Sequence, residues 1–95
     1  MADELPSIKL FLIIEDNPDL AVWLGRMLAQ QQADYQIIVA SDCLTALKFL
    51  RTCTPDLMLM DERLLMHKGV NLAPRFRMMK DLQDIPLLLF SADVI

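Results

Sequence analysis

A chain of 95 residues with a formal net charge of −4 and 55% hydrophobic residues has the size and composition of one folded domain. Its apolar content excludes a disordered chain, and an acidic balance without a basic stripe argues against direct nucleic-acid binding. Its apolar runs are far shorter than the ~20 residues that cross a bilayer, and its acidic first residues lack the positive region of a signal peptide. We therefore expect a cytoplasmic protein with no membrane or nucleic-acid partner.

The first predicted element is a buried strand at residues 8–14, an almost continuous apolar run that ends abruptly in Glu15-Asp16. A helix is predicted to follow from Pro18 to about residue 32, with Asn17 as its N-cap. Its apolar residues recur at steps of three and four, and the tryptophan among them is expected in the core: Leu20, Trp23, Leu24, Met27 and Leu28.

Residues 35–40 are short and β-branched, which predicts a second strand. Ser41 or Asp42 can cap a second helix, which ends before Pro55 because the residue preceding a proline avoids helical angles. The apolar face of this helix is predicted to comprise Cys43, Ala46, Leu47, Leu50 and Cys53. The two cysteines lie too far apart along one helix to bridge, so both are expected as reduced thiols.

A third apolar strand is predicted at residues 57–60, and it ends in the acidic pair Asp61-Glu62. A loop through Gly69 precedes a third helix, in whose first turn Pro74 is tolerated. The apolar residues expected to line this helix are Val70, Ala73, Phe76 and either Met79 or Leu82. A fourth strand at residues 86–90 ends in Ser91.

The order of these elements is β-α-β-α-β-α-β. Apolar strands that alternate with helices predict a parallel sheet covered on both faces, and right-handed crossovers then give a doubly wound α/β sheet. The strand order common in this fold class is 2-1-3-4. Ligands of such sheets bind beyond the carboxyl ends of the strands, which directs attention to the residues that follow each strand.

Acidic residues follow the first and third predicted strands, and a hydroxyl follows the fourth. Since those two strands are neighbours in the expected order, Glu15, Asp16 and Asp61 should converge. Like charges so close need a positive partner, and Mg²⁺ prefers carboxylate, water and phosphate oxygens. An acidic pair after a strand is often only a helix cap, but the coincidence with Asp61 and Ser91 favours a site over that reading.

Four segments resemble, in order and with suitable spacing, the successive signatures of response-regulator receiver domains: Leu12–Asn17, Pro55–Asp61, Gly69 and Ile85–Ala92. The resemblance implies a flavodoxin-like doubly wound fold. It also identifies residues 1–95 as a single, incomplete receiver domain that lacks the last helix, strand and helix of a complete one.

The resemblance also implies a role for each residue at the strand ends. Asp61 matches the aspartate phosphorylated by a histidine kinase or a histidine phosphotransfer protein. Asp16 matches a direct Mg²⁺ ligand, and Glu15 the second acid, which acts through a water. Arg63 matches a residue whose backbone carbonyl binds the metal, and its cationic side chain could hang over the phosphoryl group. Ser91 matches the switch hydroxyl. Such a protein is a phosphoryl acceptor and not an enzyme.

Two departures from the family pattern are visible. Leu65 stands where many members carry a proline, four residues after the acceptor aspartate. No lysine matches the one that follows the family's fifth strand, and Lys68 lies on a different loop. Without that strand the fourth strand is an edge, and its apolar residues Leu87, Leu88 and Leu89, with Val94 and Ile95, are expected to be exposed. A homodimer, a covering partner or a longer parent protein would each account for this.

Two other functions stay open from the sequence. The first is a receiver-like interaction module that assembles through the edge of its fourth strand and keeps the acids without being phosphorylated. The second is a small Mg²⁺-dependent phosphohydrolase of similar topology. Against this hydrolase stands Arg63, because it occupies the position where a second assisting acid is needed.

Overall fold

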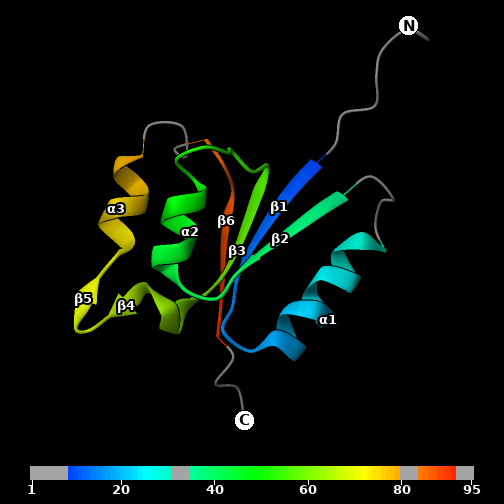
Figure 1. Cartoon of the computed structure of the whole chain (residues 1–95), viewed down its shortest axis with the longest axis horizontal. Coiled ribbons are helices and arrows are strands. Elements are labelled where there is room, and N and C mark those ends of the chain that lie inside the picture. Colours follow the sequence, from blue (N-terminus) through cyan, green and yellow to red (C-terminus); the bar gives the residue numbers. More distant parts are fainter. Residues whose placement is uncertain (1–8, 31–34, 80–83, 92–95) are drawn as a thin grey trace, which may run out of the picture.

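The computed structural model describes residues 9–30, 35–79 and 84–91. Its elements in chain order are β1 (Lys9–Ile14), α1 (Pro18–Ala29), β2 (Tyr35–Ala40), α2 (Cys43–Phe49), β3 (Leu57–Asp61), the 3₁₀ helix η1 (Glu62–Leu65), β4 (Met66–His67), β5 (Val70–Asn71), α3 (Ala73–Met78) and β6 (Leu87–Phe90). Figure 1 shows the strands of the main sheet between α1 on one side and α2 with α3 on the other. Within the described part of the chain, no helix is both long enough and apolar enough to cross a membrane.

The main sheet has four parallel strands in the order β2-β1-β3-β6. Since β6 is the fourth strand of the sequence prediction, the expected doubly wound order 2-1-3-4 is confirmed. β1 pairs on both sides, with Ile14 opposite Ala40 of β2 and Met60 of β3. Its residues from Phe11 to Ile14 are buried, as expected for the central strand of a sheet covered on both faces.

The main core lies between the sheet and the pair of helices α2 and α3. Alternate residues of β1 and β3 point to this face, where they pack against buried residues of both helices. The buried members of this core are Leu12, Ile14, Ala40, Cys43, Ala46, Leu50, Met58, Met60, Leu72 and Phe76. Cys43, Ala46 and Leu50 of the predicted second helix and Phe76 of the third are therefore confirmed as core residues, with Leu47 and Met79 partly buried against them.

The opposite face of the sheet is covered by α1, and here one expectation is wrong. Trp23 is 56% exposed and does not lie in the core. The helix instead turns its small residues Ala21 and Gly25 toward the sheet, and a Cβ added at Gly25 would lie 3.4 Å from Cγ2 of Ile37. Because this stripe allows the helix to approach β2 closely, the tryptophan is carried to the outer side.

The cover on this face is partial. A hollow of about 260 Å³ lies beside α1, lined by residues of α1, β3 and β6: Leu24, Met27, Leu28, Leu59 and Leu88. The three leucines of β6 that were expected to be exposed are exposed, whereas Val94 and Ile95 lie outside the described residues.

Side-chain caps fix where the first two helices begin. Asn17 Oδ1 accepts hydrogen bonds from the amides of Asp19 and Leu20 at 3.0 and 3.3 Å, so the predicted cap of α1 is confirmed. Asp42, and not Ser41, caps α2, because its Oδ1 accepts from the Thr45 amide at 2.7 Å. α2 is shorter than predicted.

The end of α2 is set by a tight turn. The amides of Thr52 and Cys53 both donate to the Phe49 carbonyl, and the Thr52 hydroxyl donates to the same oxygen at 3.2 Å. These bonds close the chain after the last helical residue. Cys53 therefore lies beyond the helix on which it was expected.

The loop between β3 and α3 contains structure that the sequence pattern does not predict. After η1, the strands β4 and β5 form an antiparallel hairpin through Lys68 and Gly69, whose φ angles of 50° and 80° suit a two-residue turn. Val70 belongs to β5, so its predicted place on the third helix is wrong. α3 begins at Ala73, whose amide donates to Asn71 Oδ1 at 3.0 Å, with Pro74 in its first turn as expected.

Candidate functional site

Three carboxylates meet at the carboxyl ends of the two central strands. Because Ile14 of β1 and Met60 of β3 are register partners in a parallel pair, the residues that follow them emerge at the same edge of the sheet. Glu15, Asp16 and Asp61 each offer an oxygen, and these oxygens all lie within 4.8 Å of one another. The structure thus brings together the three acids that the sequence predicted to converge; we call them the acid cluster.

Two members of the acid cluster are buried. Glu15 is 1% exposed and Asp61 is fully buried, whereas the side chain of Asp16 is half exposed. The backbone holds Glu15 in place, since its amide donates to the Ala40 carbonyl at 3.0 Å. Glu15 Oε1 accepts from the Asn17 amide at 3.1 Å, but Oε2 is the single buried side-chain oxygen or nitrogen, among residues the structure describes, without a hydrogen-bond partner.

The side chain of Arg63 lies among these carboxylates. Its Nε donates to Asp61 Oδ2 at 2.9 Å, Nη2 contacts the same oxygen, and its backbone amide donates to Asp61 Oδ1 at 3.1 Å. Nη2 also lies 3.3 Å from Asp16 Oδ1 and 3.8 Å from Glu15 Oε1. One guanidinium therefore pairs with all three acids. From the sequence we expected Arg63 to contribute its backbone carbonyl, and the ion pairs of its side chain were not foreseen.

The pKa values of the two buried carboxyls of the acid cluster are shifted in opposite directions. The pKa of Glu15 is raised to about 7, mainly by burial. The hydrogen bond from the Asn17 amide lowers this pKa, and the neighbouring Asp16 and Asp61 carboxyls raise it. Burial acts in the same direction on Asp61. There, hydrogen bonds from the side chain and amide of Arg63 outweigh it, so the pKa of Asp61 lies below its usual range. Asp61 is consequently charged at neutral pH, whereas Glu15 titrates near neutrality.

The donor set of the acid cluster fits a hard divalent cation. It offers carboxylate oxygens only, which is the chemistry Mg²⁺ prefers, and one of these oxygens, Glu15 Oε2, is buried without a partner. Glu15, Asp16 and Asp61 are the residues that would hold such an ion.

Ser91 lies at the same edge of the sheet. It follows Phe90, the register partner of Asp61 in the pairing of β3 with β6, and it is exposed. The structure therefore places the predicted hydroxyl directly after the strand that pairs with β3, whose last residue is Asp61. Ala92, which ends the last segment that carries the family resemblance, lies outside the described residues.

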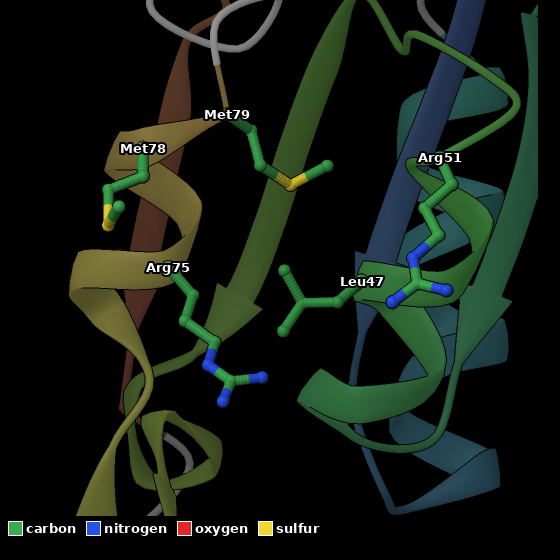
Figure 2. Close-up of a pocket in the computed structure, with 5 residues that line it drawn as sticks. All are labelled: Leu47, Arg51, Arg75, Met78 and Met79. Atoms are coloured by element: carbon green, nitrogen blue, oxygen red, sulfur yellow. The ribbon is translucent and has the colours of Figure 1, made fainter.

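A second hollow, of about 330 Å³, lies between α2 and α3, away from the acid cluster. Its lining comes from α2 and the turn after it (Leu47 and Arg51) and from α3 and its C-cap (Arg75, Met78 and Met79). Figure 2 shows Arg75 and Met79 extending from α3 toward Leu47. Among the described residues that line it, the two guanidinium groups are the charged ones and none carries a carboxylate. The acid cluster, by contrast, offers the carboxylate oxygens that a hard divalent cation prefers.

Comparison with known proteins agrees with this geometry. The sequence profile of the response regulator receiver domain matches residues 11–94. The sensor histidine kinase TmoS of Ectopseudomonas mendocina is 33% identical over 81 residues, which are 85% of this chain and 8% of that protein. The hybrid signal transduction histidine kinase D of Dictyostelium discoideum is 26% identical over 90 residues, which are 95% of this chain and 6% of that protein. The chain thus spans less than a tenth of these curated relatives.

Two solved structures share the fold. The chemotaxis response regulator CheY4 of Vibrio cholerae superposes with a TM-score of 0.73 at 20% identity, covering 87% of this chain and 68% of that one. The signal receiver domain of the DNA-binding response regulator merR from Colwellia psychrerythraea 34H superposes with a TM-score of 0.74 at 22% identity. The match covers 92% of this chain and 71% of that one. With the profile match over most of its length, the chain belongs to the response regulator receiver domain family.

Proposed function

We propose that this domain accepts a phosphoryl group on Asp61 in a Mg²⁺-dependent reaction of two-component signalling. The observation that carries the proposal is the acid cluster itself, in which a buried, charged aspartate lies within 4.8 Å of two further carboxylates at the edge of the sheet where α/β proteins bind ligands. Family membership supports the same role, since the matched relatives are histidine kinases.

The chemistry follows from the state of Asp61. In the metal-free domain, hydrogen bonds from Arg63 hold the pKa of Asp61 low, and a bound cation would likewise favour its charged form. An anionic oxygen is then present to form the bond to phosphorus as the donor's bond to phosphorus breaks. Glu15 and Asp16 would hold Mg²⁺ beside it, with the Arg63 backbone carbonyl as a further ligand. The ion supplies neutralisation of the charge on the transferring phosphoryl oxygens.

Ser91 would report the modification. It directly follows Phe90, the register partner of Asp61 and last residue of the neighbouring strand, and a hydroxyl can donate to a phosphoryl oxygen. The partners implied are a histidine kinase or a histidine phosphotransfer protein, acting in the cytoplasm. The domain is then a phosphoryl acceptor, whose only catalysis is of its own modification.

The test is phosphorylation by a small donor. Incubation with acetyl phosphate and Mg²⁺ is expected to add the mass of one phosphoryl group to the wild-type domain, and Asp61→Asn is expected to abolish the addition. Asp56→Asn, a change of the same kind at an exposed aspartate before β3, serves as the matched control and is expected to leave labelling intact. An unlabelled wild-type domain at saturating donor and Mg²⁺ would contradict the proposal.

A second candidate is an interaction module that assembles through β6. Its support is the exposure of Leu88 and Leu89 on a strand whose hydrogen-bonding partner, among the described strands, is β3 alone. It would act as a homodimer or with a covering partner. Assembly measured by sedimentation should then be weakened by Leu88→Lys and unchanged by Asp61→Asn or by Mg²⁺. A monomer at micromolar concentration would count against it.

A further inference from the structure

A cation already lies within the acid cluster. The guanidinium of Arg63 pairs with Asp61, Asp16 and Glu15 at once. We infer that this guanidinium is a tethered counter-ion of the acid cluster, which a divalent cation must displace in order to bind. The inference rests on the proposed function in that it takes the same three carboxylates as the metal ligands, and it adds a specific regulator of their occupancy.

Competition for the same oxygen is the first argument. Asp61 Oδ2 accepts from Nε at 2.9 Å and is also contacted by Nη2, so two N–H groups occupy the lone pairs that a metal would need. The other oxygen of Asp61 is engaged by the Arg63 amide at 3.1 Å. A metal at Oδ2 therefore requires that the guanidinium leave.

Repulsion between positive charges is the second argument. Nη2 lies 3.3 Å from Asp16 Oδ1 and 3.8 Å from Glu15 Oε1, which places it between the carboxylates that would surround the ion. A divalent cation at that place would face a like charge a few ångströms away, and in a partly buried setting this repulsion is strong. The acid cluster holds the guanidinium or the metal, but not both.

The exchange needs only a side-chain movement. Arg63 lies in the first turn of η1 with its side chain 39% exposed, so its long stem can rotate into water. Its backbone amide can keep the bond to Asp61 Oδ1 while this happens. Without metal, the guanidinium pairs with the two buried carboxylates and offsets part of their charge. With metal, it is released above the edge of the sheet where the phosphoryl group would lie.

The test is Mg²⁺ binding measured by titration calorimetry, with magnesium chloride alone as the probe. Arg63→Met keeps much of the stem and removes the charge. It is expected to tighten Mg²⁺ binding by about tenfold or more, since it removes both the competing bonds and the repulsion. Arg63→Lys keeps the charge but cannot make the forked contact. Its Mg²⁺ affinity is therefore expected to lie between those of wild type and Arg63→Met. Lys68→Met, which removes an exposed cation from the β4–β5 turn, is the matched control and is expected to change the affinity less than about twofold.

A second readout uses the wild-type protein and does not depend on whether a variant folds. The Nε–Hε resonance of Arg63, assigned by its loss in Arg63→Lys, is expected to show a protected guanidinium without metal and to move to the position of a solvated arginine on saturation with Mg²⁺. Thermal unfolding should show Arg63→Met less stable than wild type in chelator, with the difference reduced in Mg²⁺.

Equal Mg²⁺ affinity of wild type and Arg63→Met would overturn the inference, as would an Nε–Hε signal unchanged by saturating metal. Absence of Mg²⁺ binding to either protein would overturn it together with the metal dependence of the proposed function. Labelling of Asp61 with equal affinities would overturn this inference alone. Exchange of guanidinium for metal without any labelling would leave it standing and reject the phosphoryl-acceptor role.

Discussion

Leu10 and Asp56 are joined by two reciprocal hydrogen bonds. The Leu10 amide donates to Asp56 Oδ2 at 2.8 Å, and the Asp56 amide donates to the Leu10 carbonyl at 2.7 Å. This pair closes the β1–β3 ladder at the amino ends of both strands, the end opposite to the acid cluster. It therefore adds to the ladder bonds that hold the two strands in register, although neither residue of the pair lies near Asp61 or Glu15.

Loss of the Asp56 side-chain bond should weaken the fold without touching the acid cluster. Asp56→Ala is expected to lower the free energy of unfolding by about 1 kcal/mol, the usual contribution of one such bond. Urea denaturation measures this change. Asp56→Asn keeps an acceptor oxygen and should recover most of the loss; equal destabilisation by both substitutions would show that the bond is not the cause.

The cap of α2 should contribute to stability in a pH-dependent way. Asp42 Oδ1 accepts from the Thr45 amide at 2.7 Å, and this bond holds the pKa of Asp42 below its usual value. A lowered folded-state pKa contributes stability that is present above about pH 4 and lost as the pH falls further. Asp42→Ala is expected to cost about 1 kcal/mol at neutral pH and to make the acid limb of the stability curve shallower.

The measurement is urea denaturation of wild type and variants from neutral pH down through the acid range. Asp42→Asn keeps an oxygen that can cap the helix but cannot titrate. It should retain most of the neutral-pH stability and share the shallower acid limb. Acid limbs of the same slope in all three proteins would contradict the prediction.

Mg²⁺ binding should tighten as the pH rises through neutrality. Burial raises the pKa of Glu15 to about 7, so below that pH a proton occupies the carboxyl that the metal needs. The same raised pKa means that the contribution of Glu15 to the stability of the metal-free domain is present at acid pH and is lost as the pH rises through about 7.

Calorimetry at about pH 6 and about pH 8, in buffers of different ionisation enthalpy, should show weaker binding and more proton release at the lower pH. Glu15→Gln removes the titrating group and should flatten this dependence. Equal affinity of the wild-type domain at both values would exclude Glu15 as a protonated competitor of the metal.

The two cysteines should differ in reactivity. Cys43 is buried beside Met60, and burial, together with the nearby Asp42 charge, raises its pKa to about 11. Cys53 lies half-buried in the turn after α2. A thiol-specific disulfide reagent is expected to modify Cys53 at least about tenfold faster, because attack requires an accessible thiolate. Cys53→Ser should leave only the slow phase; a fast phase in that variant would place Cys43 at the surface.

The fold was predictable because its signals are periodic or local. Apolar runs of strand length, each followed by helical spacing, determine a parallel α/β sheet, and the caps at Asn17 and Asp42 are local bonds between a side chain and nearby amides. The convergence of Glu15, Asp16 and Asp61 followed from topology alone, since residues after neighbouring parallel strands share one edge.

Features set by tertiary packing were missed. From the apolar stripe of α1 we expected Trp23 in the core. The small residues Ala21 and Gly25 instead decide which side of the helix approaches the sheet. A strand of two residues such as β4 is too short to show a pattern of alternating apolar residues, so the sequence did not predict it. The Gly69 that follows Lys68 is the one local turn signal in this hairpin. The ion pairs of Arg63 could be anticipated only by noting that three converging acids need a positive charge and that an arginine begins the next turn.

The strands that precede the acid cluster and the strand that precedes Ser91 have different numbers of hydrogen-bonded neighbours in the sheet. β1 is hydrogen-bonded on both sides and β3 joins it to β6, whereas β6, four residues long and largely exposed, is held among the described strands by β3 alone. Local opening of a short outer strand costs less free energy than opening the centre of a sheet. We therefore expect the backbone amides of β1 and β3, the strands that position the acid cluster, to exchange with solvent more slowly than those of β6, the strand that precedes Ser91.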